Sequence, residues 1–177
     1  LALGLAAPLE AGEQFTQEEI ASSPYLQSVL RRMDERYDTS KFRKKGPYRI
    51  ALAAQGTSNS WSALFDEHAV SYAKELGKEV IEELLYADAQ ASADNQIPQV
   101  EDLLAQEPDA LILVPMGAAA LSAPVERAMA QGVPVVLCAS AVETDNFVTE
   151  VGTNLYASGA GLAKYLIEKL GGRGNVL

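Results

Sequence analysis

The residues best suited to ligand chemistry lie together in the segment YRIALAAQGTSNSW, which spans 48–61. An apolar run stops there at Gly, Thr, Ser and Asn, and an amphipathic helical pattern follows. Ser58 and Asn59 offer short polar groups, and the Asn59 amide presents donors and an acceptor in one plane, which suits vicinal hydroxyls. Trp61 adds a flat apolar face on which a sugar ring can stack. A strand that turns directly into a helix presents such side chains at the edge where open α/β sheets bind ligands.

Each of these residues also has a structural interpretation. Ser58 or Ser60 is expected to cap the helix that follows, and Trp61 fits the core as well as a ligand-contacting wall. Other chemistries lack their residue patterns: the chain has no GxGxxG, GK[ST], HExxH or CxxC, and residues 56–60 break GxSxG at its last position. We therefore expect a binding protein that is not an enzyme and that uses no cofactor and no metal.

The elements that must position these residues follow from the hydrophobic periodicity. The first helix is expected to turn Trp61, Phe65 and Tyr72 inward. The third helix is expected to take Ser122 as its N-cap and Pro124 in its first turn. The predicted strands are 49–55, 79–86, 110–114, 133–138 and 147–151, and the predicted helices are 60–76, 94–106, one from Ser122 to Gly132, and 156–170. Strands separated by such helices indicate right-handed crossovers and an α/β fold with a doubly wound parallel sheet flanked by helices.

Composition bounds the class of protein. The chain has 177 residues, of which 48% are hydrophobic, and a net charge of -10. This length supports one domain with a core but not two complete domains. The acidic balance argues against nucleic acid as a partner, because phosphate binding needs clustered Lys and Arg. The short basic run at 41–45 fits a solvated linker.

The N-terminal residues and the single cysteine bear on the compartment. LALGLAAPLEA at 1–11 is too short to span a membrane. It is typical of the end of a secretory signal before a small-residue cleavage site, and a frayed, Ala-rich terminus is the alternative. Cys138 has no disulfide partner in the chain and ends a buried-strand pattern, which favours a packing role over a nucleophile. Because no Cys lies at the cleavage point, we expect an exported, soluble, periplasmic protein without a lipid anchor.

Across 48–177 the chain resembles the sugar-type, ribose-binding-like periplasmic binding proteins of ABC transporters. The matching pieces run in order: SNSW, NQIPQVEDLLAQEPDALILVP, APVERAMAQGVPVVL and VGTNLYASGAGLAKYLIEKLGGRGNV. The resemblance implies the type I fold, in which two hinged α/β lobes hold the ligand. It also implies ligand contacts from Asn59 and Trp61 and from the end of the fourth strand. This chain has Ala139 and Ser140 there instead of the family's Asp-Arg pair, which argues against a simple ribose or galactose assignment.

The same resemblance divides the chain and suggests its partners. After the signal remnant at 1–11 and an N-terminal extension at 12–47, it implies a first lobe at 48–140, a hinge crossing at 141–147 and the start of a second, similar lobe at 148–177. The implied function is the substrate-binding component of an ABC importer, a monomer that captures a small polar solute such as a sugar for a membrane permease. Two alternatives stay open: the effector domain of a sugar-responsive transcription regulator, and an enzyme on a doubly wound sheet.

Overall fold

A computed structural model describes residues 16, 18, 21, 37–153 and 155–175 of the chain. The contacts divide the chain into two compact units, of which one is Asp38–Thr153 and the other contains the described residues at 155–175. The predicted signal remnant at 1–11, most of the predicted N-terminal extension at 12–47 and the last two residues lie outside the described residues. Within the described ranges, no helix combines the length and the apolar character that crossing a membrane requires.

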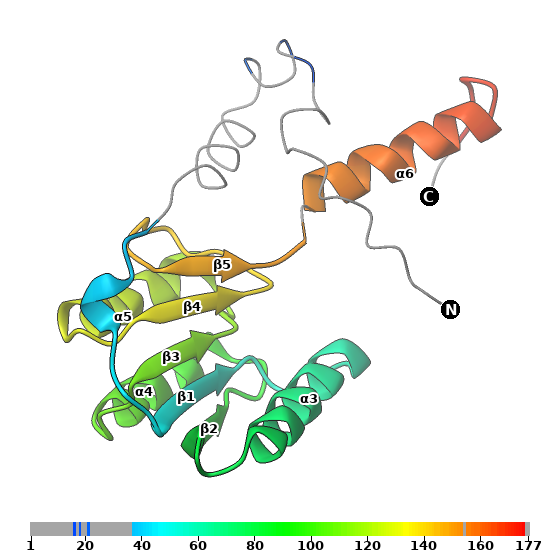
Figure 1. Cartoon of the computed structure of the whole chain (residues 1–177). Helices are drawn as coiled ribbons and strands as arrows, with labels where there is room; N and C mark the ends of the chain where they lie inside the picture. Colours follow the sequence, from blue (N-terminus) through cyan, green and yellow to red (C-terminus); the bar gives the residue numbers. More distant parts are fainter. Residues whose placement is uncertain (1–15, 17, 19–20, 22–36, 154, 176–177) are drawn as a thin grey trace. The chain divides into compact units, whose positions relative to one another are not determined.

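The unit at Asp38–Thr153 is built on one parallel sheet with the strand order β2-β1-β3-β4-β5 (Figure 1). The chain crosses from β1 to β2 in one direction and from β2 past β1 to β3 and β4 in the other. Because such crossovers are right-handed, α3 lies on one face of the sheet and α4 and α5 lie on the other. The strands are β1 (Tyr48–Ala54), β2 (Ile81–Asp88), β3 (Ala110–Leu113), β4 (Val135–Cys138) and β5 (Thr149–Val151), and the helices are η2 (Ser40–Phe42), α3 (Ser60–Leu76), α4 (Ala93–Leu104) and α5 (Ala118–Ala130). The predicted doubly wound parallel sheet is confirmed.

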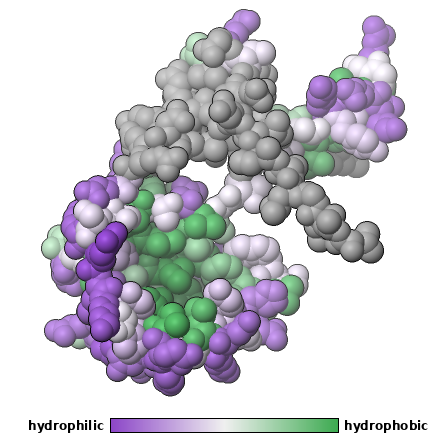
Figure 2. All heavy atoms as spheres, viewed as in Figure 1, coloured by the Kyte–Doolittle hydropathy of each residue, from purple (hydrophilic) through white to green (hydrophobic). Residues whose placement is uncertain are grey.

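The strand register sorts the sheet residues into two faces. Ala51, Leu111 and Val135 stand side by side across β1, β3 and β4 and are fully buried. Ile112 and Val136 follow them in the chain, so they point to the opposite face, and they are only half-buried. Figure 2 shows hydrophobic residues gathered over the sheet and framed by hydrophilic ones. The apolar core therefore extends through the middle of the sheet.

Helix α3 has the predicted bounds but turns a different face inward. Trp61 and Tyr72, predicted to point inward, are 50% and 60% exposed, whereas Ser62 and Asp66 are buried. The helix packs on the edge strand β2, where the Tyr86 hydroxyl donates to Asp66 Oδ2 at 2.8 Å. The predicted inward face is wrong because the hydrogen bond between Tyr86 and Asp66, rather than the aromatic stripe, holds α3 to the sheet.

Helix α5 begins one turn before its predicted start. Its first residue is Ala118 and its N-cap is Gly117, so the predicted N-cap at Ser122 is wrong. The Ser122 hydroxyl instead donates to Ala118 O at 2.8 Å and accepts from Glu143 N at 2.9 Å. The reason lies in three consecutive alanines at 118–120, which favour helix strongly and extend it upstream. Pro124 consequently lies inside α5 rather than in its first turn.

The segment at 141–147, predicted as the hinge crossing, is bound to α5. The Asn146 side-chain amide donates to Glu126 Oε2 at 2.6 Å, and the Thr144 hydroxyl donates to Glu126 Oε1. These two hydrogen bonds, that of Thr144 first, lower the pKa of Glu126. The chain then enters β5, which pairs in parallel with β4. The compact unit therefore continues to Thr153, and the predicted boundary between 147 and 148 falls inside it.

In the second unit, the described helix is α6 (Leu155–Lys169), which lies close to the predicted 156–170. The helix stops at Gly171 and Gly172, whose φ angles are +63° and +81°. The Gly172 N–H donates back to Ile167 O at 2.9 Å. This is the left-handed glycine stop that ends many helices, so the paired glycines terminate α6.

Candidate ligand-binding edge

The carboxyl ends of the parallel strands meet at one edge of the sheet, where open α/β folds bind ligands. Four turns leave this edge, at 55–59 after β1, 89–92 after β2, 114–117 after β3 and 139–140 after β4. Ser58 and Asn59 lie in the first turn, and Ala139 and Ser140 form the last. Since β3 separates β1 from β4, the strand spacing puts these two turns roughly 10 Å apart. The sheet thus brings four of the five predicted site residues to one edge.

The turn after β1 is held close to the turn after β2. The Ala91 N–H donates to Gln55 O at 2.8 Å. Gly56 is buried and has a φ of +112°, and a Cβ atom there would stand 2.8 Å from both Ala91 N and Asp88 Oδ1. Only glycine fits this approach and this backbone conformation. Gly56 therefore sets the path by which the chain reaches 57–59.

Asn59 is the N-cap of α3. Its Oδ1 accepts from Ser62 N at 3.0 Å, and its own N–H donates to Ser62 Oγ at 3.4 Å, which completes a capping box. The prediction that Ser58 or Ser60 caps the helix is wrong, because Asn59 has Ser62 as a reciprocal partner. Within the described residues, the Asn59 Nδ2 group makes no hydrogen bond. Asn59 is thus suited to donate from Nδ2 to a ligand oxygen while its side-chain Oδ1 caps the helix.

Trp61 lies in the first turn of α3, and its side chain is half exposed. Its ring stacks on Phe65 with 5.5 Å between centroids and 21° between planes. The core interpretation of Trp61 is therefore wrong. The indole borders an open groove of about 750 Å³ that follows α3 and is lined by Trp61, Leu64, Phe65, His68, Ala69, Ser71, Tyr72 and Glu75. That lining includes neither Ser58 nor Ser140, so Trp61 shares this groove only with other α3 residues.

The chain turns sharply after β4. Ala139 has a φ of +65°, and the Ser140 N–H donates to Cys138 O at 2.8 Å, an i to i+2 bond typical of a γ-turn. The Ala139 N–H donates to Val151 O at 2.9 Å, so it is already paired with β5. Ser140 is exposed, and its hydroxyl is the accessible polar group of this turn. Cys138 is half-buried, and burial raises the pKa of its thiol, which fits a packing role.

Strained backbone gathers at the same edge. Among the described residues other than glycine, Gln90, Ala91, Glu107 and Ala139 have positive φ. All but Glu107 lie in the turns of the carboxyl edge. Holding a residue in this region costs about 1–3 kcal/mol, and such residues cluster at sites where a fixed shape serves function. The turns at this edge are therefore shaped by the surrounding structure.

A buried acid joins α3 to the carboxyl end of β2. Burial raises the pKa of Asp66, the hydrogen bond from the Tyr86 hydroxyl lowers it, and the nearby Asp88 raises it. Burial and the same partner raise the pKa of Tyr86, so the phenol stays protonated and donates. This contact fixes α3, and with it the first turn that carries Asn59 and Trp61.

The sequence analysis missed Gln96, whose side chain is fully buried beside this edge. Its Nε2 donates to Val114 O at 2.9 Å and to the carbonyl oxygens of Ala53 and Ala54 at 3.3 Å each, and its Oε1 accepts from Met116 N at 2.9 Å. The available signal was its place in α4, at helical spacing from the apolar residues at 100, 103 and 104. A polar residue at a core position indicates buried hydrogen-bond partners.

The exposed groups in the turns after β1 and β4 are neutral. They include the Ser58 and Ser140 hydroxyls and the Asn59 amide. The ion pairs among the described residues lie elsewhere, and join Lys44 to Asp109, Arg49 to Glu83 and Arg127 to Glu101. In the same part of the chain, no three His, Cys, Asp or Glu side chains come together to hold a metal ion. Neutral donors and acceptors of this kind suit the hydroxyls of an uncharged polar solute.

Comparison with known proteins agrees with this architecture. The family profile described as a periplasmic binding protein domain matches residues 50–177. The ribose import binding protein RbsB of Bacillus subtilis (strain 168) is 32% identical over 127 residues, which are 72% of this chain and 40% of that protein. The xylitol-binding protein of Mycolicibacterium smegmatis is 33% identical over 95 residues, which are 54% of this chain and 27% of that protein. The chain thus spans at most about two fifths of the length of these relatives.

Solved structures share the fold. The periplasmic binding protein component of the arabinose ABC transporter from Shewanella sp. ANA-3 is 26% identical with a TM-score of 0.64, over 71% of this chain and 41% of that one. An ABC sugar transporter subunit from Rhodobacter sphaeroides 2.4.1 is 27% identical with a TM-score of 0.67, over 76% of this chain and 45% of that one. The relatives and solved structures named above are binding proteins rather than enzymes, and their similarity to this chain fits a non-enzymatic binding role. The chain belongs to the periplasmic binding protein family, and its sheet with the flanking helices is a lobe of the type I fold.

Proposed function

We propose that this protein is the substrate-binding component of an ABC importer and that it captures a small polar solute, a sugar or a related polyol. The observation that carries the proposal is the carboxyl edge itself, where strained turns hold neutral polar groups at the surface of a rigid parallel sheet. The relatives support the solute class, since their names refer to ribose and xylitol. In the whole protein, two hinged lobes would enclose the solute, and this edge would supply one side of the site.

Each predicted residue has a separate role in this proposal. Asn59 donates from Nδ2 to a solute oxygen, because its Oδ1 is occupied by the Ser62 N–H. Ser58 and Ser140 offer exposed hydroxyls that donate and accept. Ala139 contributes no polar side chain and instead fixes the turn that presents Ser140. Trp61 contributes its exposed indole face, on which the C–H face of a sugar ring stacks.

The proposal extends to partners and location. A membrane permease receives the solute, the protein is a monomer, and it is exported to the periplasm in soluble form. The family supports the periplasmic location, and the net charge of -10 disfavours nucleic acid as a partner.

A ligand panel tests the proposed function. Full-length protein is screened by thermal shift against D-ribose, xylitol, L-arabinose, D-galactose and sugar acids, and positive compounds are measured by calorimetry. A ligand at 100 times its Kd stabilises the folded protein by about 2.7 kcal/mol, so a true ligand gives a clear rise in Tm. We expect at least one sugar or polyol to bind. A panel without any shift, followed by binding of an oligonucleotide, would overturn the proposal in favour of the regulator.

Trp61 offers a more local test of the site. We expect its fluorescence to change when a positive sugar from the panel saturates the protein, because stacking replaces water against the half-exposed indole. The variant Trp61→Phe identifies the part of the signal that belongs to this residue, and Tyr72→Phe, in the same groove, serves as the control variant. A saturated protein whose Trp61 signal stays constant would remove Trp61 from the site.

A further inference from the structure

Gln96 enters the sheet from the first turn of α4 at the point where two strands end. Its partners are the last carbonyl groups of β1, at Ala53 and Ala54, and the backbone just beyond β3, at Val114 and Met116. The side chain has no exposed surface. A single buried amide therefore touches the backbone of both central strands immediately before the chain leaves them.

The partners fix the orientation of this amide. An NH₂ group has two hydrogens, so the Val114 oxygen at 2.9 Å takes one and the oxygens of Ala53 and Ala54, both at 3.3 Å, share the other. The amide oxygen faces the Met116 N–H at 2.9 Å. With the amide reversed, an oxygen would face three carbonyl oxygens. Both amide hydrogens and the amide oxygen are thus bonded in this one arrangement.

These bonds continue the pairing of β1 and β3 past its natural end. The last direct bond between the two segments runs from Val114 N to Ala53 O at 3.1 Å. Beyond it, the chain turns into 55–59 on one side and 115–117 on the other. We infer that Gln96 is a positioning residue that fixes these two turns relative to each other and so presents Ser58 and Asn59 in a defined geometry. The inference rests on the proposed function, because it concerns the same site.

The neighbouring Gln99 provides a matched control. It lies on α4 one turn after Gln96, and its Nε2 donates to Asp88 O on β2 at 2.8 Å. Its Oε1 is buried and has no hydrogen-bond partner within the described residues. A change at Gln99 therefore removes a similar bond between α4 and the sheet, but one that ends on the outer strand and not on β1 or on the backbone after β3.

The test compares Gln96→Met with Gln99→Met, since methionine keeps the length of the side chain and removes its polar atoms. Amide hydrogen exchange is measured without ligand, and the Kd for the panel sugar with the highest affinity, with D-ribose as the first probe, is measured by calorimetry. For Gln96→Met we expect amide exchange at 55–59 and 116–117 to rise at least tenfold and the Kd to rise at least tenfold. For Gln99→Met we expect less than a threefold change in the exchange rates and in the Kd, even if its Tm falls as far as that of Gln96→Met.

A measurement on the unmodified protein covers the case in which Gln96→Met does not fold. The Gln96 side-chain amide protons should exchange with deuterium far more slowly than those of Gln131, which is exposed. Equal side-chain exchange rates, or equal loop protection in the two methionine variants, would overturn the inference. If no sugar binds the unmodified protein, the proposed function fails, whereas the exchange comparison still decides whether Gln96 shapes the two turns.

Discussion

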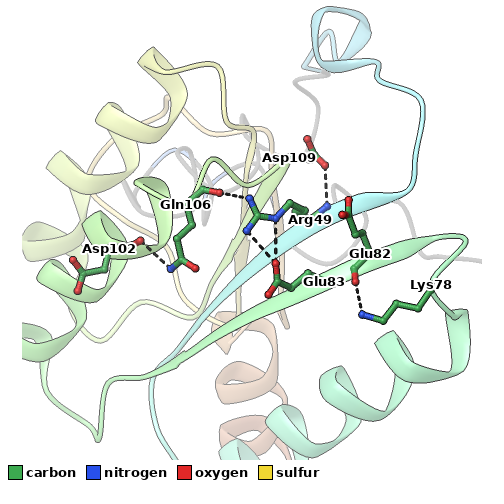
Figure 3. Close-up of polar contacts among 7 residues, drawn as sticks. All are labelled: Arg49, Lys78, Glu82, Glu83, Asp102, Gln106 and Asp109. Carbon is green, nitrogen blue, oxygen red and sulfur yellow. Dashed lines mark hydrogen bonds and ion pairs between the residues drawn. The ribbon is translucent and has the colours of Figure 1, made fainter.

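At the amino edge of the sheet, charged groups bind one another: the Arg49 guanidinium donates to Glu83 Oε2, and Asp109 accepts from Arg49 N at 2.8 Å (Figure 3). Asp109 also pairs with Lys44. At the carboxyl edge, the contacts that hold the turns after β1 and β3 are neutral. The Gln96 amide joins β1 to β3, the Asn59 amide caps α3, and Gly56 lets two turns approach closely. The same parallel sheet thus has one edge held by charges and one held by amides and glycine.

The difference follows from what each edge must leave free. The exposed ion pairs at the amino edge contribute little each, because water competes for the charges. In these contacts the polar groups are bonded to one another: the Arg49 guanidinium, for example, contacts both Glu83 and Gln106 O (Figure 3). The carboxyl edge uses buried neutral bonds for its architecture, and the hydroxyls and the Asn59 Nδ2 remain free for a solute. An edge can bind a ligand when its own stability does not depend on its exposed groups.

The largest loss of stability is expected from a substitution at Gly56, where the turns after β1 and β2 approach each other closely. Gly56→Ala places a Cβ 2.8 Å from backbone and at a φ of +112°, so strain and overpacking together should lower the free energy of unfolding by more than about 2 kcal/mol. Gly132→Ala at the amino edge has a φ of +83° but open space around the Cβ. Because only the backbone is strained there, its loss of unfolding free energy should be smaller than that of Gly56→Ala by at least about 1 kcal/mol. Urea unfolding of both variants checks the difference, and equal losses would contradict the close approach at 56.

An intermediate effect is expected when the amino edge loses its central acid. Asp109→Ala leaves the Arg49 N–H without its acceptor, which should cost about 1–3 kcal/mol, and the affinity for a panel sugar should stay within threefold. Burial raises the pKa of Asp109, but hydrogen bonds from Lys44 and from the Arg49 N–H, with the charges of both residues, lower it more. Stability from this group is therefore present above about pH 4 and is lost as pH falls through the lowered pKa.

The pH dependence supplies the control for that variant. Asp109→Asn cannot ionise, so its stability should fall less steeply than that of the unmodified protein as the pH is lowered below about 4. Thermal unfolding between pH 2 and 7 measures both curves. Parallel curves for the two proteins would mean that Asp109 does not carry the acid sensitivity of the amino edge.

The smallest change in stability is expected at Asn59, where one residue serves both the helix and the proposed ligand. Asn59→Ala removes the cap and should cost about 1 kcal/mol as well as ligand affinity. Asn59→Asp keeps an oxygen for the Ser62 N–H and adds a charge that the helix N-terminus favours, so stability should hold while affinity falls at least fivefold. Calorimetry with a panel sugar separates these roles. Full affinity in Asn59→Asp would show that Nδ2 does not contact the solute.

The sequence predicted the elements of this unit well but predicted poorly which groups hold them together. Long apolar and periodic runs located the strands and α3 because burial imposes a period on the chain. The aromatic residues of α3 were placed inside because periodicity does not reveal that β2 presents a tyrosine hydroxyl to Asp66. Gln96 was missed for a related reason, since its partners are backbone groups of strands more than 15 residues away.

The strand pairing after β4 shows the same limit at the level of topology. Residues 141–147 carry polar side chains, of which Thr144 and Asn146 bind Glu126 on α5, and the predicted hinge at 141–147 stays a prediction. Three strand residues at 149–151 are then enough to add β5 to the sheet. A short exposed strand carries little apolar signal, so its pairing partner follows from the fold and not from local pattern.

The strand order has a consequence for how the chain assembles during synthesis. β2 adds to β1, β3 adds to the free side of β1, β4 adds to β3, and β5 adds to β4. Each strand after β1 thus pairs with a strand that the ribosome has already synthesised. The paired residues are 60 positions apart for Ile50 and Ala110 and 13 apart for Val136 and Thr149, and the entropy cost of loop closure grows only slowly with that separation. The sheet can therefore grow outward from β1 at the pace of translation, and each stage is a smaller parallel sheet of the same kind.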